Sequence, residues 1–125
     1  MFKIQCIDHI VLRTNNLEKL VAFYCDLLGC KIEKIIEEIG LIQLRAGESL
    51  IDLLPVEADI AADRSTLDHF CLRIKPFDYE FLKSYFHDKG VLLYNYGTRH
   101  GAEGYGESVY LKDPEGNEIE LKSTR

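Results

Sequence analysis

The most constraining feature of this chain is an internal repeat. Residues 8–13 read DHIVLR and residues 68–73, sixty positions later, read DHFCLR, so four of the six positions are identical. Each half also ends on an acidic residue between two aliphatic ones, IDL at 51–53 and IEL at 119–121. Self-similarity at a fixed spacing is typical of duplicated structural units. The sequence therefore predicts two copies of one fold.

Hydrophobic periodicity gives both halves the same order of elements. In the first half we expect one helix and four strands, the helix at 17–28 and the strands at 6–13, 31–38, 41–45 and 49–54. In the second half the helix is expected at 78–89 and the strands at 67–74, 91–96, 107–111 and 117–122. Each half is thus a βαβββ unit.

The ends of the two helices carry recognisable signals. Asn15 with Glu18 is a candidate capping pair for the first helix, and Gly29 and Gly90 can supply the left-handed residue that ends each helix. The second helix has a predicted apolar face made of Phe81, Leu82, Tyr85 and Phe86.

These elements predict an α+β fold in which two βαβββ modules form a curled, open mixed sheet. At 125 residues the chain fits a single domain. We expect module one at about 1–54, a linker at about 55–66 and module two at about 67–125.

Composition excludes several classes of partner. A net charge of −6 without a cluster of Lys and Arg argues against nucleic acid, and no apolar run is long enough to span a membrane. The N-terminus has no secretion-signal pattern, so the cytoplasm is the expected location. Four cysteines without a C-x-x-C pair, in apolar stretches, predict buried free thiols.

Four residues of the repeat predict one metal site. Side chains alternate along a strand, so His9 shares a face with Arg13, and His69 shares a face with Arg73. If the two units pack about a pseudo-twofold axis, both histidines face a common cavity. Asp52 and Glu120 on the closing strands would line the same cavity. Two imidazoles and two carboxylates suit a divalent ion such as Zn, Ni, Co, Mn or Fe.

Each of these residues also has an ordinary interpretation. A single strand histidine is usually a satisfied structural residue, and a single strand carboxylate usually faces solvent. The joint recurrence of histidine and acid at matching positions of both halves favours the metal site.

Several segments together resemble the vicinal oxygen chelate superfamily, which includes glyoxalase I, bleomycin resistance proteins and extradiol dioxygenases. The segments are DH at 8–9 and 68–69, FYCDLLG at 23–29, LIDL at 50–53 and DPEGNEIEL at 113–121. The chain is most similar to the small glyoxalase-like members. That resemblance implies a glyoxalase-like fold and a homodimer whose metal sites combine ligands from two chains.

The resemblance also implies a ligand set and a chemistry. The bacterial glyoxalase I pattern of His, Glu, His, Glu falls on His9, Asp52, His69 and Glu120. Asp52 departs from the pattern because aspartate is one methylene shorter than glutamate. The implied function is that of a metal-dependent lyase or isomerase acting on a small oxygenated acid or a thiol adduct. The candidate base is Glu120, or Asp52 if it detaches.

Candidate substrate-binding residues are mostly cationic, which predicts an anionic small molecule. Arg13 resembles the arginine with which glyoxalase I holds a glutathione carboxylate, and Arg45 and Arg73 are further candidates. Residues 97–106 contain four glycines and are expected to form either a mobile lid or a plain surface loop. As a lid, this segment would bring Arg99, His100 and Tyr105 to the substrate.

Two other functions fit a chain of this kind. An Fe(II) ring-cleaving dioxygenase needs two histidines and one carboxylate, whereas four candidate ligands are present here. A non-catalytic small-molecule-binding module of the resistance type usually lacks the histidines. Fosfomycin modification is a weaker prediction, because only five residues follow Glu120 and a basic C-terminal stretch is expected there.

Overall fold

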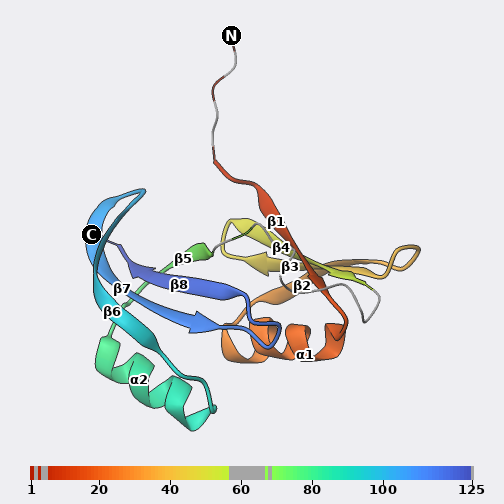
Figure 1. The fold of residues 1–125 in the computed structure, drawn as a ribbon. Helices are drawn as coiled ribbons and strands as arrows, with labels where there is room; N and C mark the ends of the chain where they lie inside the picture. Colours follow the sequence, from red (N-terminus) through yellow and green to blue (C-terminus); the bar gives the residue numbers. More distant parts are fainter. Residues whose placement is uncertain (2, 4–5, 57–66, 68, 125) are drawn as a thin grey trace. The chain divides into compact units, whose positions relative to one another are not determined.

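The computed structural model describes residues 1, 3, 6–56, 67 and 69–124. The chain divides into two compact units, Met1–Ala62 and Asp63–Arg125. Each unit has its own four-stranded mixed sheet and few helices (Figure 1). The predicted α+β class with two similar modules is therefore confirmed.

The described residues of unit 1 form six elements. They are β1 (His9–Thr14), α1 (Leu17–Val21), a π-helical segment (Ala22–Leu27), β2 (Lys31–Ile36), β3 (Leu41–Ala46) and β4 (Ser49–Pro55). The strand order is β1-β4-β3-β2. β1 runs parallel to β4, while the other neighbours are antiparallel. The predicted strand at 6–13 begins three residues later, at His9.

The core of unit 1 lies on one face of its sheet. Leu12, Leu44 and Leu53 point to this face and are buried. Leu20 of α1 and Tyr24 of the π-helical segment are completely buried, and α1 contacts β4. Full burial of one such leucine contributes about 1.5–3 kcal/mol. The opposite face, here called the polar face, carries His9 and Asp52 together with apolar residues such as Val11 and Leu50.

The first helix differs from its prediction at its N-cap and in its second half. Its N-cap is Asn16, whose side chain accepts a hydrogen bond from the Lys19 amide at 3.1 Å, so the proposed cap at Asn15 is wrong by one residue. After Val21 the helix widens into a π-helical turn, with the Leu28 amide bonded to the Phe23 carbonyl. Gly29 ends the helix at φ +82°, as predicted.

Unit 2 repeats the plan. Its elements are β5 (Phe70–Ile74), α2 (Tyr79–Asp88), β6 (Tyr94–Gly101), β7 (Gly104–Lys112) and β8 (Glu118–Ser123). The strand order β5-β8-β7-β6 matches that of unit 1 element for element, with β5 parallel to β8. The predicted linker falls largely on residues 57–66, which lie outside the described residues.

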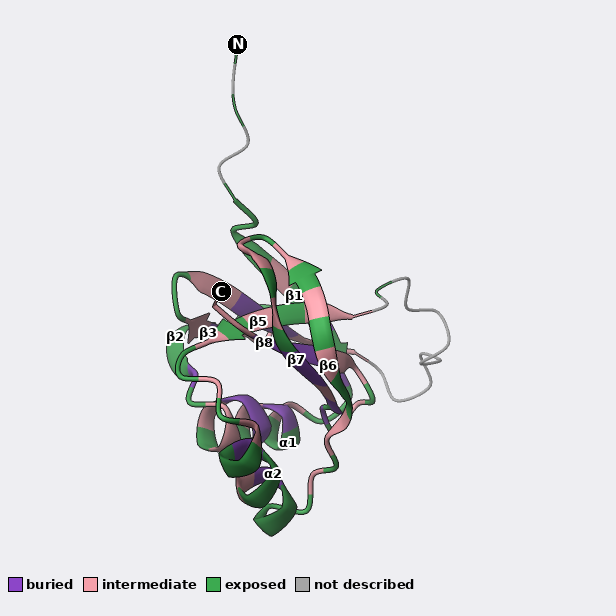
Figure 2. Ribbon diagram, turned by 90° about the vertical axis from the view of Figure 1, so that its left-hand side faces the viewer, coloured by how far each residue is buried: buried purple, intermediate pink, exposed green. Residues whose placement is uncertain are grey.

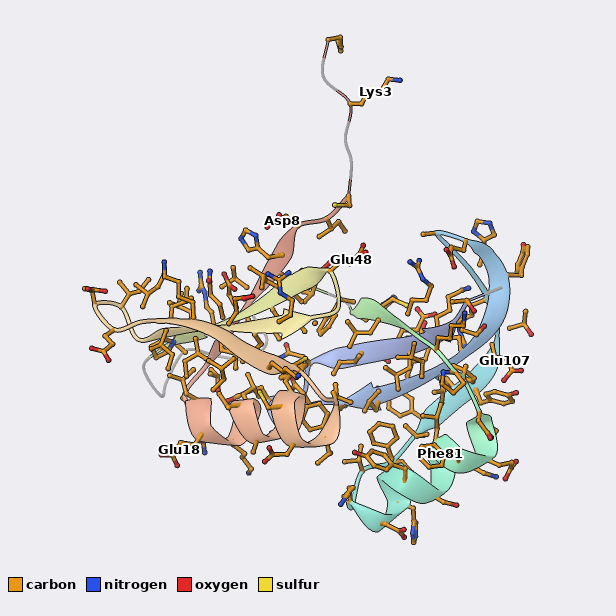
Figure 3. All side chains as sticks on the ribbon, turned by 180° about the vertical axis from the view of Figure 1, so that it is seen from behind. Lys3, Asp8, Glu18, Glu48, Phe81 and Glu107 are labelled. Carbon is orange, nitrogen blue, oxygen red and sulfur yellow. The ribbon has the colours of Figure 1, made fainter. Side chains whose placement is uncertain are left out.

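Helix α2 lies on one face of the unit 2 sheet. The Asp78 side chain caps it by accepting from the Phe81 amide at 3.2 Å. Leu82 and Phe86 are buried, and Tyr79 stacks on Tyr96 of β6 with ring centroids 3.7 Å apart. Phe81 is 61% exposed, so its predicted place on the apolar face is wrong (Figure 3). Most of the helix surface is exposed (Figure 2).

The predicted loop at 97–106 is instead the paired end of the β6–β7 hairpin. Pairing continues through His100 with Tyr105 to Gly101 with Gly104. The glycines make room for a neighbour, because a Cβ on Gly101 would lie 2.8 Å from Cε of Lys122. The expectation of an unpaired loop is therefore wrong.

The structure also bears on the predictions about membrane spans and cysteines. No helix in the described part of the chain is long and apolar enough to cross a membrane. All four cysteines are free thiols, but only Cys30 is buried. Cys25 is half-buried, while Cys6 and Cys71 are exposed, so burial is the wrong prediction for these last two.

Candidate metal centre

Unit 1 brings together one predicted histidine and one predicted carboxylate. In the parallel pair of β1 and β4, His9 lies opposite Leu50 and Val11 lies opposite Asp52. His9 and Asp52 therefore project from the same face of the sheet, on neighbouring strands. The charge of Asp52 is close enough to help raise the pKa of His9.

Asp8 holds one nitrogen of the His9 ring. His9 Nδ1 lies 2.7 Å from Asp8 Oδ1. Asp8 lies at the entry to β1 (Figure 3). This hydrogen bond is the main reason why the pKa of His9 is raised above its usual value, with the Asp52 charge adding to it. Because Nδ1–H donates its hydrogen bond to Asp8, the Nε2 lone pair of the neutral ring remains available to a ligand.

Asp52 is a buried carboxylate with little hydrogen bonding. Asp52 is only 4% exposed to solvent. Oδ2 lies 3.5 Å from Gln43 Nε2, which is a long contact, and Oδ1 is buried without any hydrogen-bond partner. An unsatisfied buried carboxylate oxygen is costly unless a cation approaches it.

Unit 2 brings together the second pair. Cys71 lies opposite Glu120 in the parallel pair of β5 and β8, and His69 precedes Cys71 by two residues, on the same face. His69 Nε2 lies 3.4 Å from Glu120 Oε1. Glu120 is 7% exposed. Each unit thus places a histidine beside a carboxylate on the polar face of its sheet.

Two residues that the sequence did not single out hold the Glu120 carboxylate. Ser108 Oγ donates to Oε2 at 2.7 Å, and the Tyr110 hydroxyl donates to Oε1 at 3.3 Å. Both are on β7, which pairs with β8. Strand alternation places them on the Glu120 face, and that is the only signal by which the sequence could have indicated them.

Arg99 is the predicted substrate-binding residue that lies nearest to these groups. Its guanidinium carbon lies 4.8 Å from the centroid of the Tyr110 ring, and Nη1 donates to the Ser108 carbonyl at 3.4 Å. A bulge between Tyr94 and Gly97 shifts the register of β6 and so keeps Arg99 on the Glu120 face.

The other predicted arginines differ in their surroundings. Arg73 is on the Glu120 face and contacts Glu103 at 3.4 Å. Arg45 is held by Glu33, with Nη2 3.0 Å from Oε1. Arg13 is exposed on the same face of β1 as His9.

His100 and Tyr105 face away from the candidate ligands. They lie opposite each other near the hairpin turn, with ring centroids 5.0 Å apart. Their neighbours Arg99 and Gly106 form the next pair along the hairpin and lie on the Glu120 face, so alternation puts His100 and Tyr105 on the other one.

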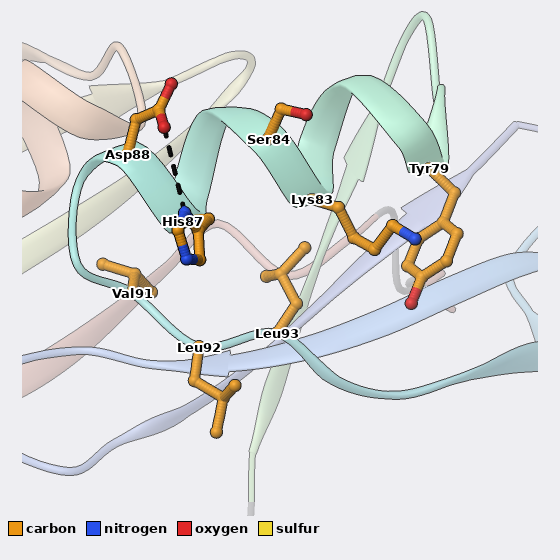
Figure 4. Close-up of a pocket in the computed structure, with 8 residues that line it drawn as sticks. All are labelled: Tyr79, Lys83, Ser84, His87, Asp88, Val91, Leu92 and Leu93. Atoms are coloured by element: carbon orange, nitrogen blue, oxygen red, sulfur yellow. Dashed lines mark ion pairs between the residues drawn. The ribbon is translucent and has the colours of Figure 1, made fainter.

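A separate hollow opens beside α2 (Figure 4). Its volume is about 570 Å³, and its lining includes Tyr79, Lys83, His87 and Leu92. Tyr79 stacks on Tyr96, whose hydroxyl donates to Glu107, and Glu107 lies on the sheet face opposite Glu120. None of the predicted site residues lines this hollow.

The donor atoms of each pair are of kinds that bind divalent metals. Among the described residues there is no cluster of three or more His, Cys, Asp or Glu that could bind an ion. Each unit offers one imidazole and one carboxylate. Imidazole nitrogen and carboxylate oxygen are common ligands of a borderline divalent cation, and the unpartnered Oδ1 of Asp52 is suited to a positive neighbour.

Solved structures similar to this chain come from several bacteria. A protein from the mobile metagenome of V. pseudocholerae is 28% identical, with a TM-score of 0.80 and coverage of 100% of this chain and 98% of that one. A virulence protein of Salmonella typhimurium is 26% identical, with a TM-score of 0.80 and coverage of 99% and 100%.

A lactoylglutathione lyase from Agrobacterium tumefaciens shares the fold at 21% identity, with a TM-score of 0.69 and coverage of 96% of this chain and 94% of that one. A comparison with curated proteins finds no match. The sequence model of the Glyoxalase/Bleomycin resistance protein/Dioxygenase superfamily matches residues 6–121, nearly the whole chain. The protein therefore belongs to the Glyoxalase/Bleomycin resistance protein/Dioxygenase superfamily.

Proposed function

We propose that His9, Asp52, His69 and Glu120 bind one divalent metal ion, and that the protein is a metal-dependent lyase or isomerase of glyoxalase type. The observation that carries this proposal is the recurrence of a histidine beside a buried carboxylate on the polar face of each sheet. Coincidence is a poor explanation, because the strand order is the same in both units and the pairs occupy equivalent strands.

The ligand atoms follow from the hydrogen bonds of each residue. His9 would bind through Nε2, since Nδ1 is engaged by Asp8. Asp52 would bind through Oδ1, the oxygen without a partner. Glu120 would bind through Oε1, which lies on the His69 side of the carboxylate. Zn, Ni, Co, Mn and Fe all accept such nitrogen and oxygen donors.

The chemistry needs both the metal and the protein side chains. A divalent ion with open positions polarises a substrate carbonyl and lowers the cost of negative charge on its oxygen. A carboxylate of the chain then removes the proton next to the carbonyl. Glu120 and Asp52 are the two candidates. Asp52 accepts only the long contact from Gln43, whereas Glu120 is held by Ser108 and Tyr110.

We propose a small anionic substrate, either an oxygenated acid or a thiol adduct. Arg99 lies over Tyr110, whose hydroxyl contacts Glu120, and it is the best supported substrate-binding residue. Arg13 and Arg73 share the polar faces with the ligand pairs and are further candidates. A homodimer in the cytoplasm is the form in which we expect the enzyme to act.

Metal analysis of the purified protein tests this proposal directly. Mass spectrometry of the metal content should find about one divalent ion per chain. The paired change His9→Ala with His69→Ala should remove it. His87→Ala is the matched control, because the His87 side chain is 90% exposed on α2 and belongs to neither pair. An unchanged metal content in the double variant would rule out the site.

A ring-cleaving Fe(II) dioxygenase is the alternative if Asp52 is not a ligand, because His9, His69 and Glu120 would then form a set of two histidines and one carboxylate. Protein loaded with Fe(II) should then consume oxygen with a catechol, which the lyase or isomerase would not do. A binding module without catalysis would take up small anions and turn over neither substrate class.

A further inference from the structure

The carboxylate of Glu120 is restrained at both oxygens by side chains of unit 2. Oε2 accepts the hydroxyl proton of Ser108 at 2.7 Å, and Oε1 accepts from Tyr110 at 3.3 Å. His69 Nε2 also lies 3.4 Å from Oε1. The contact with Ser108 is the shortest of these three. It therefore fixes the orientation of the carboxylate more tightly than the other two.

Ser108 is placed so that its hydroxyl has one strong acceptor. It is completely buried, so bulk water cannot compete for the bond. On β7 it pairs with Lys122, while Tyr110 pairs with Glu120, so Ser108 is the diagonal neighbour of Glu120 across the strand pair. An ionised carboxylate can only accept, and the hydroxyl therefore donates its single proton to Oε2.

Unit 1 has no equivalent of this serine. Gln43 pairs with Asp52 as Tyr110 pairs with Glu120. Leu41 lies two residues before Gln43 on β3, and Ser108 lies two residues before Tyr110 on β7. A leucine cannot donate a hydrogen bond, and Asp52 correspondingly keeps one buried oxygen without a partner. The two halves of the repeat have thus diverged in how their carboxylates are held.

We propose that Ser108 is a positioning residue for Glu120. Its hydroxyl occupies Oε2 with a hydrogen bond, so that Oε1, the oxygen beside His69, is the atom that coordinates the metal. This inference rests on the proposed metal site. It predicts that Glu120 binds through one oxygen, and that loss of the Ser108 hydroxyl lets the carboxylate rotate and bind less tightly.

Cobalt binding separates this role from a merely structural one. Co(II) titrated into the metal-free protein reports affinity by calorimetry and ligand geometry by its visible spectrum. Ser108→Ala should weaken Co(II) binding about 10- to 100-fold, as for other residues that orient a ligand, and should change the spectrum. Ser108→Thr retains the hydroxyl and should restore both properties.

Val109→Ala is the matched control. Val109 is the next residue on β7, is also completely buried and points to the opposite face. It should lower the melting temperature but leave Co(II) affinity and spectrum unchanged. Equal Co(II) affinity and spectrum in wild type and Ser108→Ala would overturn the role of Ser108 while leaving the metal site intact. Absence of Co(II) binding by the wild type would instead overturn the metal site, and the role of Ser108 with it.

Discussion

His9 Nδ1 lies 2.7 Å from the Asp8 carboxylate, and this hydrogen bond raises the pKa of His9. The charged imidazole is therefore favoured in the folded protein. Such a group adds stability at pH values below the usual histidine pKa of about 6.5, and this contribution is lost as the pH rises through the higher folded-state pKa. Both residues are at the surface, so the effect on stability is small.

We predict that Asp8→Asn lowers the pKa of His9 toward its usual value, because both the charge and the strong acceptor are lost. The measurement is a proton NMR titration of the histidine signals in metal-free protein. Asp88→Asn is the control, since Asp88 lies 3.9 Å from His87 on α2 and should not affect His9. An unchanged His9 titration in Asp8→Asn would contradict the assignment.

The stability of the metal-free protein should depend on Asp52. A buried carboxylate oxygen without a partner costs about 1–3 kcal/mol. Asp52→Asn removes the charge with little change in shape, so we expect the metal-free variant to unfold at a higher denaturant concentration than wild type. Added Zn(II) should stabilise the wild type more than the variant. A less stable metal-free variant would show that Asp52 has a structural partner.

The shorter side chain of Asp52 should decide which substrates are accepted. Methylglyoxal with glutathione is expected to be a poor substrate, because aspartate reaches one methylene less far than the glutamate of the bacterial glyoxalase I pattern. Asp52→Glu should raise turnover of the hemithioacetal, measured by the absorbance of the thioester product. Robust turnover by the wild type would contradict this argument.

Much of the fold could be predicted because the repeat and the periodicity agree. Gly29 and Gly90 both adopt positive φ at helix ends, and His9, Asp52 and Glu120 lie on strands as expected. His69 is the exception, because it immediately precedes β5. The hairpin at 97–106 is not predicted by the sequence because glycine favours loops, whereas here Gly101 leaves room for the Lys122 side chain. Local sequence contains no sign of that tertiary neighbour.

The groups that hold Glu120 were missed for a related reason. A repeat indicates only those residues that its two halves have in common. The first half has Leu41 and Gln43 at the positions where the second half has Ser108 and Tyr110. Only the paired register of β7 and β8 reveals that the serine hydroxyl reaches the carboxylate. Differences between the halves therefore had to come from the structure.

The thiol of Cys30 should resist modification in the folded protein. Burial raises its pKa to about 11, so almost none of it is thiolate at pH 8. Cys6 is exposed and should react with a disulfide reagent at a normal rate. Mass spectrometry after a brief treatment should find Cys30 unmodified until denaturant is added. Rapid labelling of Cys30 in native conditions would show that this part of unit 1 opens readily.

Metal sites built from two chains should be rescued in mixed dimers. If each site takes His9 and Asp52 from one chain and His69 and Glu120 from the other, a dimer of His9→Ala with His69→Ala holds one intact site and one doubly broken site. Random pairing of co-expressed variants makes half of the dimers mixed, so the metal content should be about one quarter of wild type. If each site formed within one chain, the mixed dimers would bind no metal. Because either variant alone lacks metal under both arrangements, the recovered quarter identifies ligand sharing between subunits.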